Sequence, residues 1–329
     1  MTNSLLSVQD LCVSFKTESG ELNVLDHVSF DLLKGKTLGL VGESGCGKSV
    51  TSMSIMRLLP QPAGLINKGT ITYDNKDLLQ LNSVQLREIR GNRIAMIFQE
   101  PMTALNPVQT IGSQILEVFK LHRKELSPKE ALKSALDILD RVGIPDAKIR
   151  ISEFPHQLSG GMRQRVVIAM ALACKPDILI ADEPTTALDV TIQAQILELM
   201  KDLQEEMGMG ILFITHDLGV IAELCDDIVV MYAGRVVEKT SVLSLFKSPK
   251  HPYSKGLLDS IPKIETTKRK RLDTIDGQVP SLTEMPSGCR FYNRCPAAED
   301  LCKQQSHTLQ QVTPEHYVNC HKWEEANNG

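Results

Sequence analysis

The sequence predicts an α/β protein whose core is a largely parallel β-sheet. Three stretches carry this prediction: a strand, a glycine-rich loop and a helix in succession over 36–59, and two short apolar strands at 178–182 and 210–214 that end in polar residues. Buried strands of a parallel sheet are continuously apolar and present their carboxyl ends to a ligand crevice. We therefore expect the chemistry of this chain at those strand ends.

Length and charge narrow the class of protein. A chain of 329 residues with 42% apolar content can bury a full core and is long enough for two domains. The 36 basic and 40 acidic residues give a net charge of −4, which argues against binding nucleic acid by general phosphate attraction. The most apolar stretch, 211–232, is interrupted by charged residues, and the start lacks a signal peptide. We expect a cytoplasmic protein with reduced or metal-bound cysteines.

The first two strands are expected at 5–15 and 24–33, with Ser19-Gly20 as the turn between them. Phe15 stands near the end of the first strand. Its ring either fills the core as part of an alternating strand or stacks on the adenine base of a bound nucleotide.

The loop at 42–49 reads Gly-Glu-Ser-Gly-Cys-Gly-Lys-Ser and lies between a predicted strand, 36–41, and a predicted helix, 50–59. This is the context of a phosphate-binding loop, whose backbone N–H groups and following helix face phosphate oxygens. Lys48 is expected to reach the outer phosphates and Ser49 to coordinate Mg²⁺. The residues expected to contact the nucleotide here are Gly42, Glu43, Ser44, Gly45, Cys46, Gly47, Lys48, Ser49 and Val50.

Two more strands, 69–73 and 94–98, precede a helical segment that we place at about 100–165. Its first helix is expected at 111–124. The next helix is marked by an N-cap, a proline in the first turn, an N3 glutamate and a terminal glycine. These marks are Ser127, Pro128, Glu130 and Gly143, and the expected core-facing residues are Leu132, Leu136 and Leu139.

Ser159-Gly160-Gly161 precedes a predicted helix at 164–175 and is either a linker or a second anion site at a helix N-terminus. Asp182 and Glu183 follow the strand at 178–182. Asp182 is placed to hold Mg²⁺ through water, and Glu183 to take a proton from, or orient, the attacking water. His216 follows the strand at 210–214 and reaches the same sheet edge. It is either structural or part of the site at that edge.

Together these segments resemble, in order and spacing, the motif set of an ATP-binding cassette (ABC) ATPase. The resemblance covers about residues 5–255. It implies a P-loop NTPase core with an antiparallel β subdomain and a helical subdomain, forming a nucleotide-binding domain at 1–255 that is followed by a C-terminal extension at 256–329. The quoted motifs are 42–49, Gln99, 158–164, 178–183, 187–189 and His216.

The resemblance also implies residue roles and an active ATPase. Ser159, Gly160 and Gly161 would contact the ATP of a second cassette across a dimer interface. Gln99 would contact Mg²⁺ or water and report on the membrane partner. Asp189 would link the two sites and His216 would touch the outer phosphate. The implied catalytic set is Glu183, His216, Gln99 and Lys48, with Mg²⁺ held by Ser49, Gln99 and Asp182.

The tail concentrates half of the eight cysteines: Cys289, Cys295, Cys302 and Cys320. In a reducing compartment such clustering favours a metal site over disulfides. Gaps of five, six and seventeen residues are wide for zinc and suit a four-iron, four-sulfur (4Fe-4S) cluster, although zinc and no metal remain alternatives. His316 and His321 are possible replacement ligands. The remaining cysteines read as small core residues: Cys12, Cys46, Cys174 and Cys225.

The segments 277–281 and 288–296 resemble the C-terminal extension of dipeptide and oligopeptide importer ATPases. The chain looks most like the D-type subunit of such an importer. This implies a peripheral protein at the cytoplasmic face of the plasma (inner) membrane, without nucleic acid. Its implied partners are a second, different ABC ATPase, two transmembrane permease subunits and, through them, an extracytoplasmic peptide-binding protein. Alternatives are a nickel or other small-solute importer, a soluble non-transport ABC ATPase, and an iron–sulfur sensor.

Overall fold

The computed structural model describes residues 4–18, 20–99, 104–186, 188–261 and 274–324. The chain forms two compact units. Unit 1 consists mainly of Leu33–Lys36 and Gln80–Phe213, and unit 2 of Thr2–Leu32, Thr37–Leu79 and Ile214–Gly329.

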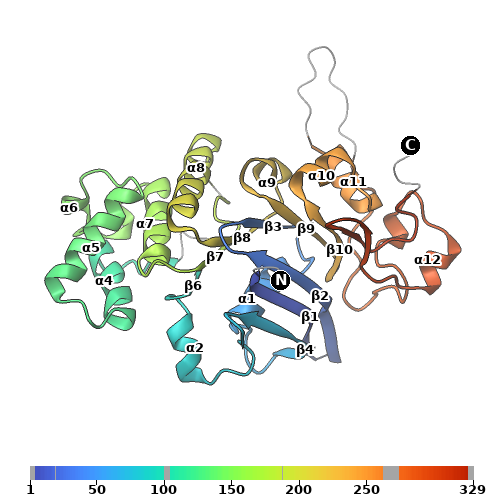
Figure 1. The fold of residues 1–329 in the computed structure, drawn as a ribbon, viewed down its shortest axis with the longest axis horizontal. Coiled ribbons are helices and arrows are strands. Elements are labelled where there is room, and N and C mark those ends of the chain that lie inside the picture. Colours follow the sequence, from blue (N-terminus) through green and yellow to red (C-terminus); the bar gives the residue numbers. More distant parts are fainter. Residues whose placement is uncertain (1–3, 19, 100–103, 187, 262–273, 325–329) are drawn as a thin grey trace, which may run out of the picture. The chain divides into compact units, whose positions relative to one another are not determined.

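Unit 2 contains a four-stranded sheet in the order β2-β1-β4-β5, in which β4 pairs antiparallel with both β1 and β5. Its strands β1, β2 and β4 are labelled in Figure 1. The strands expected at 5–15, 24–33 and 69–73 are confirmed, and each is longer than predicted. Their bounds are β1 (Ser4–Thr17), β2 (Gly20–Leu33), β4 (Gly64–Tyr73) and β5 (Lys76–Asp77).

A bulge in β1 explains why its apolar alternation is imperfect. The β1–β4 register shifts between Gln9 and Cys12, where Asp10 has a positive φ of 55°. Val8 is buried before the bulge and Leu11 after it, so the buried face changes from even to odd residues. One extra residue in a strand produces this change.

The second sheet of unit 2 contains strands from both the predicted cassette and the tail. β3 (Thr37–Val41) runs parallel to β9 (Asp227–Tyr232), which pairs antiparallel with β10 (Arg235–Ser241). The tail adds β12 (His316–Val318) to β10, and β11 (Gln310–Thr313) pairs with β12. The C-terminal residues therefore extend the sheet that carries the phosphate loop, which the sequence analysis did not predict.

The helices of unit 2 are short. Helix α1 ends at Ile55 and not at the predicted residue 59, because Arg57 adopts a positive φ of 50° that no helix continues. The domain boundary expected after residue 255 falls inside α11 and remains a prediction. The helical bounds are α1 (Lys48–Ile55), α9 (Leu218–Leu224), α10 (Val242–Lys247), α11 (Pro252–Asp259), the 3₁₀ turn η2 (Tyr292–Arg294) and α12 (Asp300–Gln304).

Unit 1 joins parallel strands to a group of helices. β6 (Ile94–Ile97) lies parallel to β7 (Ile178–Asp182), and β8 (Gly210–Thr215) begins in this unit. The regular structure in the segment expected to be helical at about 100–165 is all helical where it is described, with turns between the helices, and α4, α5, α6 and α7 lie together in Figure 1. The helices are α2 (Ser83–Ile89), α4 (Ile111–His122), α5 (Pro128–Arg141), α6 (Ala147–Arg150), the 3₁₀ turn η1 (Pro155–Gln157), α7 (Gly160–Leu172) and α8 (Val190–Met207).

Helix α5 confirms its predicted start but only part of its predicted buried face, since Leu139 is buried as predicted. The Ser127 side chain accepts the N–H of Glu130, whose carboxylate accepts the N–H of Ser127 at 2.9 Å. Leu132, however, is 42% exposed, and the fully buried residues of α5 are Ala135, Ile138 and Leu139. The buried stripe is thus centred about one turn further along the helix, where the i, i+3, i+4 spacing is also apolar.

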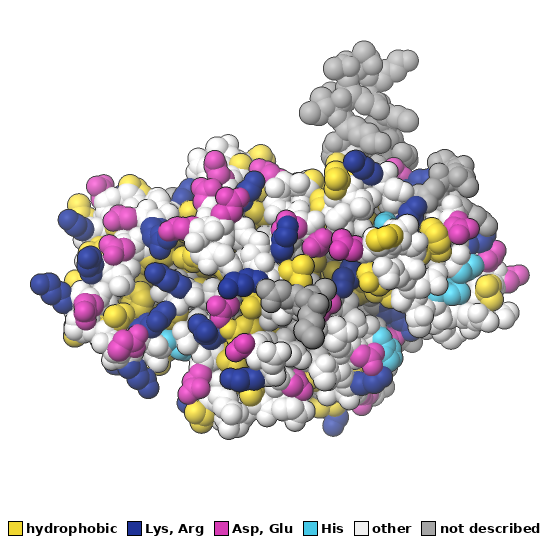
Figure 2. Space-filling model, viewed as in Figure 1, with side chains coloured by type: hydrophobic (Ala, Val, Ile, Leu, Met, Phe, Trp, Pro, Cys, Tyr) yellow, Lys and Arg dark blue, Asp and Glu magenta, His cyan; other side chains and the backbone are white. Residues whose placement is uncertain are grey.

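No helix among the described residues combines the length and apolarity needed to cross a bilayer. On the face shown in Figure 2, basic and acidic side chains are interspersed, in keeping with the nearly balanced charge of the sequence.

Candidate functional site

The phosphate loop joins β3 to α1 in unit 2, as predicted. Gly42 and Gly47 have φ angles of 151° and 102°. A Cβ atom on Gly42 would lie 2.2 Å from the carbonyl oxygen of Met231, and one on Gly47 would lie 2.5 Å from Leu25. Both positions therefore require glycine because of close backbone or side-chain approach, and the loop takes the curled path that phosphate binding needs.

Lys48 lies at the centre of this loop. Its side chain is 6% exposed, and its Nζ donates to the carbonyl oxygens of Gly42 at 2.7 Å and Glu43 at 3.2 Å. Burial raises the pKa of the neighbouring Cys46 thiol, which is therefore neutral beside this ammonium. An anion that enters the loop can exchange with the carbonyl oxygens around Nζ, because phosphate oxygens are stronger acceptors for an ammonium group.

Ser49 and Val50, in the first turn of α1, are half-buried. Phe15 is half-buried on β1 opposite Gly64, and its ring would lie 3.5 Å from a Cβ atom placed on that glycine. His216 is exposed in unit 2, directly after β8. The structure thus leaves both interpretations of Phe15 and of His216 open.

In unit 1, the end of β7 carries the two predicted acids. Asp182 is 2% exposed, and Glu183 has a positive φ of 48°, so its side chain leaves the strand direction. The Glu183 carboxylate accepts a hydrogen bond from the Gln99 amide and one from the Thr186 hydroxyl, both at 3.1 Å. The structure therefore brings together Gln99 and Glu183, which are 84 residues apart in the sequence.

The Ser159-Gly160-Gly161 segment starts α7 itself, so the predicted helix start at 164 is wrong by one turn. The Ser159 hydroxyl caps the helix by accepting the N–H of Met162 at 3.3 Å. A Cβ atom on Gly161 would lie 2.9 Å from Ile192 of α8. Gly160 and Gly161 themselves carry no side chain over the first turn of this thirteen-residue helix, where N–H groups can face an anion.

Two further residues of unit 1 complete the described motifs. Gln164, in α7, donates from its amide to the carbonyl oxygen of Pro184 at 2.6 Å and is 1% exposed. It ties α7 to the loop after Glu183, a contact that the sequence analysis missed. Asp189 is the N-cap of α8, where it accepts the N–H of Ile192 at 2.9 Å. Ala187 lies outside the described residues.

The four tail cysteines line a single cavity in unit 2, together with His307 and His321. All eight cysteines of the chain are free thiols. Burial raises the pKa of the Cys289 thiol, that of Cys295 to about 11 and that of Cys320 to about 12. Among the described residues, Nε2 of His307 and Nδ1 of His321 are buried without a hydrogen-bond partner. The cavity thus offers four thiols, and two imidazole nitrogens that lack a hydrogen-bond partner among the described residues.

The histidines that line the cysteine cavity are only partly those that the sequence analysis named. His316, predicted as a possible metal ligand, instead pairs through Nε2 with the buried carboxylate of Glu238 at 2.7 Å and helps to attach β12 to β10. His307 was missed, and only its position between two cysteines in the sequence could have indicated it. Of the two predicted histidines, His321 lines the cysteine cavity.

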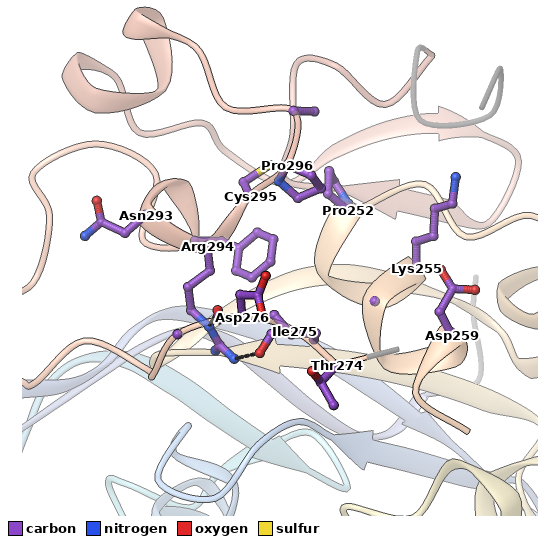
Figure 3. Close-up of a pocket in the computed structure, with 14 residues that line it drawn as sticks. Pro252, Lys255, Asp259, Thr274, Ile275, Asp276, Asn293, Arg294, Cys295 and Pro296 are labelled. Carbon is purple, nitrogen blue, oxygen red and sulfur yellow. Dashed lines mark hydrogen bonds between the residues drawn. The ribbon is translucent and has the colours of Figure 1, made fainter. Parts of the chain in front are cut away.

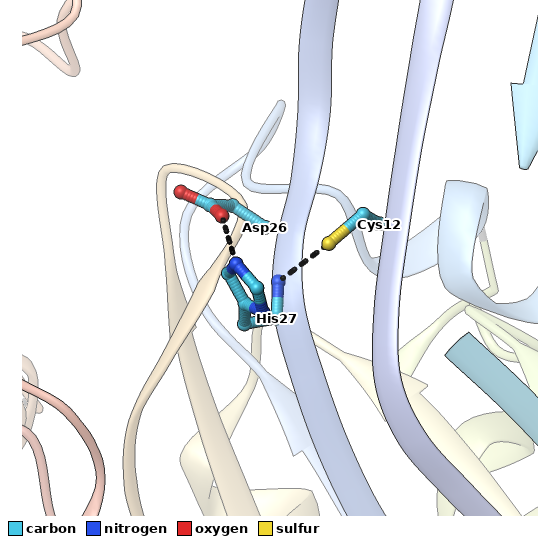
Figure 4. Close-up of side chains that lie close together, drawn as sticks. All are labelled: Cys12, Asp26 and His27. Atoms are coloured by element: carbon cyan, nitrogen blue, oxygen red, sulfur yellow. Dashed lines mark hydrogen bonds and ion pairs between the residues drawn. The ribbon is translucent and has the colours of Figure 1, made fainter. Parts of the chain in front are cut away.

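A second group of potential ligands lies on β1 and β2 (Figure 4). Atoms of Cys12, Asp26 and His27 lie within 4.8 Å of one another. Asp26, however, is already paired with Arg235 at 2.7 Å and Arg290 at 2.6 Å. Burial opposes ionisation of Asp26, but these guanidinium groups hold its pKa below the usual value. We interpret this group as a structural charge cluster.

Two family models match the chain. The model described as ABC transporter matches residues 25–186, and the one described as the C-terminal region of oligopeptide/dipeptide transporters matches residues 237–302. The first contains the phosphate loop, Gln99 and Glu183. The second contains three of the four tail cysteines and ends before Cys320.

Comparison with individual proteins points to the same family. The chain is 51% identical over 324 residues to a probable peptide ABC transporter ATP-binding protein of Sinorhizobium fredii, covering 98% of this chain and 96% of that protein. It is 52% identical over 316 residues to the dipeptide transport ATP-binding protein DppD of Bacillus subtilis, covering 96% and 94%. The dimeric post-hydrolysis structure of the ATP-binding cassette MJ0796 bound to ADP and Pi superposes with a TM-score of 0.64 at 29% identity, covering 72% of this chain and 98% of that one.

Proposed function

Because this chain belongs to the ABC transporter family of ATP-binding proteins, we propose that it is the ATP-hydrolysing subunit of an importer for dipeptides or oligopeptides. The observation that carries the proposal is the glycine-dependent curl of residues 42–49 around the buried ammonium of Lys48. Its relatives that act on peptides match this chain over nearly its whole length, including the tail. That extent supports a peptide importer over a nickel importer or a soluble ATPase.

At the phosphate loop, Lys48 releases the carbonyl oxygens of Gly42 and Glu43 and donates to the outer phosphates of ATP. The N–H groups of the loop and of the first turn of α1 bind the remaining phosphate oxygens. Phe15 stacks on the adenine base. Ser49, Gln99 and Asp182 would hold Mg²⁺, which would offset the charge of the phosphates.

For hydrolysis, Glu183 orients the attacking water and accepts its proton. Its hydrogen bond from Gln99 supports this role, because an amide donor holds the carboxylate in one orientation while leaving an oxygen lone pair for water. Lys48 and His216 stabilise the charge that develops on the transferred phosphoryl group.

Two cassettes act together in the proposed cycle. Ser159, Gly160 and Gly161 bind the ATP held by a second, different ATPase subunit, and Asp189 links the two sites. Closure of this pair excludes bulk water, and the segment around Gln99 passes the movement to two permease subunits. The chain accordingly works at the cytoplasmic face of the membrane, beneath permeases that receive peptide from an extracytoplasmic binding protein.

The cysteine cavity is proposed to hold a 4Fe-4S cluster bound by Cys289, Cys295, Cys302 and Cys320. Four thiols and two unsatisfied imidazole nitrogens around one cavity fit a cationic metal group. Zinc would draw four sulfur atoms to about 3.8 Å from one another. Among the described residues, no three ligand atoms of this cavity lie within 4.8 Å of one another, which favours the larger cluster. The cluster would crosslink the tail.

Replacement of the proposed base tests the function. Glu183→Gln should retain ATP binding and lower kcat by about 10²- to 10⁴-fold, because the amide cannot accept the proton. Turnover and binding of a fluorescent ATP analogue are measured on the same preparation. Glu198→Gln, on the exposed face of α8, is the matched control and should hydrolyse ATP at the wild-type rate. A Glu183→Gln rate close to wild type would remove Glu183 from this role.

A further inference from the structure

The phosphate loop is held from outside by the cysteine-bearing segment of the tail. The guanidinium of Arg294 binds the carboxylate of Glu43 through two parallel contacts, of 2.6 Å and 2.9 Å. The Arg294 side chain is 3% exposed and that of Glu43 is 31% exposed. Paired contacts of this kind fix direction as well as distance, so Arg294 sets where the Glu43 side chain can lie.

Arg294 is itself held by groups that are not part of the loop. Its Nε donates to the carbonyl oxygen of Asp276 at 3.0 Å, and Nη2 donates to that of Ile275 at 3.3 Å. Figure 3 shows the side chain running down from the backbone beside Cys295 to these two carbonyls, at the edge of a cavity of about 660 Å³. The guanidinium also lies over the ring of Tyr232, 5.7 Å from its centre. Its position is therefore fixed whether or not Glu43 is present.

A second contact fixes the backbone of the same loop residue. The hydroxyl of Tyr253, in α11, accepts the N–H of Glu43 at 2.9 Å. Tyr253 is fully buried and packs edge-on against Tyr232 and Phe291, with ring centres 4.7 Å and 5.3 Å away. Phe291 and Arg294 both stand between Cys289 and Cys295. One short tail segment therefore supports both contacts to Glu43.

Charge gives these contacts a consequence for ATP binding. Glu43 is part of a loop that receives a highly anionic ligand, and an unpaired carboxylate there would repel it. The two contacts with Arg294 neutralise Glu43 and hold its side chain on the tail side of the loop. Its peptide is at the same time fixed by Lys48 and by Tyr253.

We propose that Arg294 is a positioning residue for nucleotide binding, which neutralises Glu43 and fixes the phosphate loop from the cysteine-bearing tail. This inference rests on the proposed binding of ATP at residues 42–49. It assigns the tail a part in the affinity of the ATP site, beyond any role of its cysteines in binding metal.

The test compares Arg294→Met with Arg290→Met in the full-length protein. Arg290 lies on the same segment with a side chain 9% exposed, but its guanidinium binds Asp26 and the carbonyl oxygen of Ala233 instead of Glu43. Binding of a fluorescent ATP analogue with Mg²⁺ is measured by titration, together with KM and kcat. Arg294→Met should weaken binding roughly tenfold and raise KM with little change in kcat. Arg290→Met should leave binding unchanged.

A charge-removing double variant separates positioning from a merely structural role. In Arg294→Met with Glu43→Gln, no carboxylate remains to repel ATP, so binding should recover most of the loss. Equal weakening in Arg294→Met and Arg290→Met, or no recovery in the double variant, would overturn the inference. Iron content and melting temperature are followed in each variant to confirm that it is folded. If the wild-type protein binds no ATP analogue, it is the proposed function that fails; if wild type and Arg294→Met bind equally, only this inference fails.

Discussion

The phosphate loop and the cysteine cavity lie in the same unit of the chain but are built in opposite ways. The loop consists of eight consecutive residues, and its central charge, Lys48, is already satisfied by the carbonyl oxygens of Gly42 and Glu43. The cavity is lined by residues dispersed from Cys289 to His321 and from α11. Two of its imidazole nitrogens have no hydrogen-bond partner among the described residues, and burial raises the pKa of the thiols of Cys289, Cys295 and Cys320.

The difference concerns what each site needs from its ligand. The loop already has the arrangement expected of an anion site, in which phosphate oxygens would replace protein oxygens around one ammonium group. The cavity differs, because its thiols must release protons to solvent before they can bind a metal cation. Nucleotide should therefore bind without changing how the loop is built, whereas metal should contribute to the folding of the tail.

The largest expected effect is on nucleotide binding, when the ammonium group of the loop is replaced. Lys48→Met removes the charge that meets the outer phosphates but fills similar space, so binding of an ATP analogue should weaken by about 100-fold or more. Titration with the fluorescent analogue measures this loss. Iron content should equal that of wild type, because Lys48 does not contact the cavity. Loss of iron together with nucleotide would show that the two sites are not separate.

Replacing one cavity thiol should have a smaller effect, and it should remove metal while leaving nucleotide binding nearly unchanged. In an anaerobic preparation, the wild-type protein should contain about four irons per chain. Cys320→Ser leaves three thiols and should lose most of this iron and the acid-labile sulfide. The melting temperature should fall, since the proposed cluster would crosslink distant residues of the tail.

Cys12→Ser is the matched control for that experiment, because Cys12 is a half-buried thiol of β1 outside the cavity. It should keep its iron. Zinc in place of iron, or a wild-type protein without metal, would contradict the proposed cluster. Affinity for the ATP analogue should change only slightly in Cys320→Ser, because Arg294 keeps its contacts with the carbonyl oxygens of Asp276 and Ile275.

Local spacing explains why the sequence predicted the phosphate loop and most strands. Glycine at 42 and 47 is dictated by positive φ angles and close neighbours, and the capping box at Ser127 by contacts three residues apart, so both leave a pattern in a short window. The buried face of α5 was misplaced because Leu132 and Ala135 both satisfy a helical period. Which of the two is buried depends on what packs against the helix.

Contacts between distant segments explain what the sequence could not predict. Glu43 and Arg294 are 251 residues apart, and neither has a neighbour that indicates its partner. The pairing of β12 with β10 depends on short strands whose residues alternate weakly. His316 was considered a possible replacement metal ligand because nothing nearby pointed to Glu238. The cysteines were grouped correctly in one cavity because clustering is itself a sequence feature.

The smallest expected effect concerns His251, which lines the cysteine cavity and also caps the helix that carries Tyr253. Its Nδ1 accepts the N–H of Tyr253 at 3.1 Å, so the folded protein holds this imidazole neutral. Burial lowers the pKa of His251 to about 4, against the influence of Glu238. Below its ordinary value of 6.5, the unfolded chain binds a proton that the folded chain refuses, and stability falls as the pH falls.

By pH 5 this single group should cost about 2 kcal/mol of unfolding free energy relative to pH 7.5. His251→Asn keeps a capping side chain but removes the titration, so its melting temperature should fall less than that of wild type between these pH values. Carboxylates that lose stability in acid, such as Asp26, are common to both proteins and cancel in the difference. Parallel melting curves would show that His251 is protonated in the folded state. In that case its Nδ1 could not accept the N–H of Tyr253, and the support of the phosphate loop from α11 would be weaker than the geometry indicates.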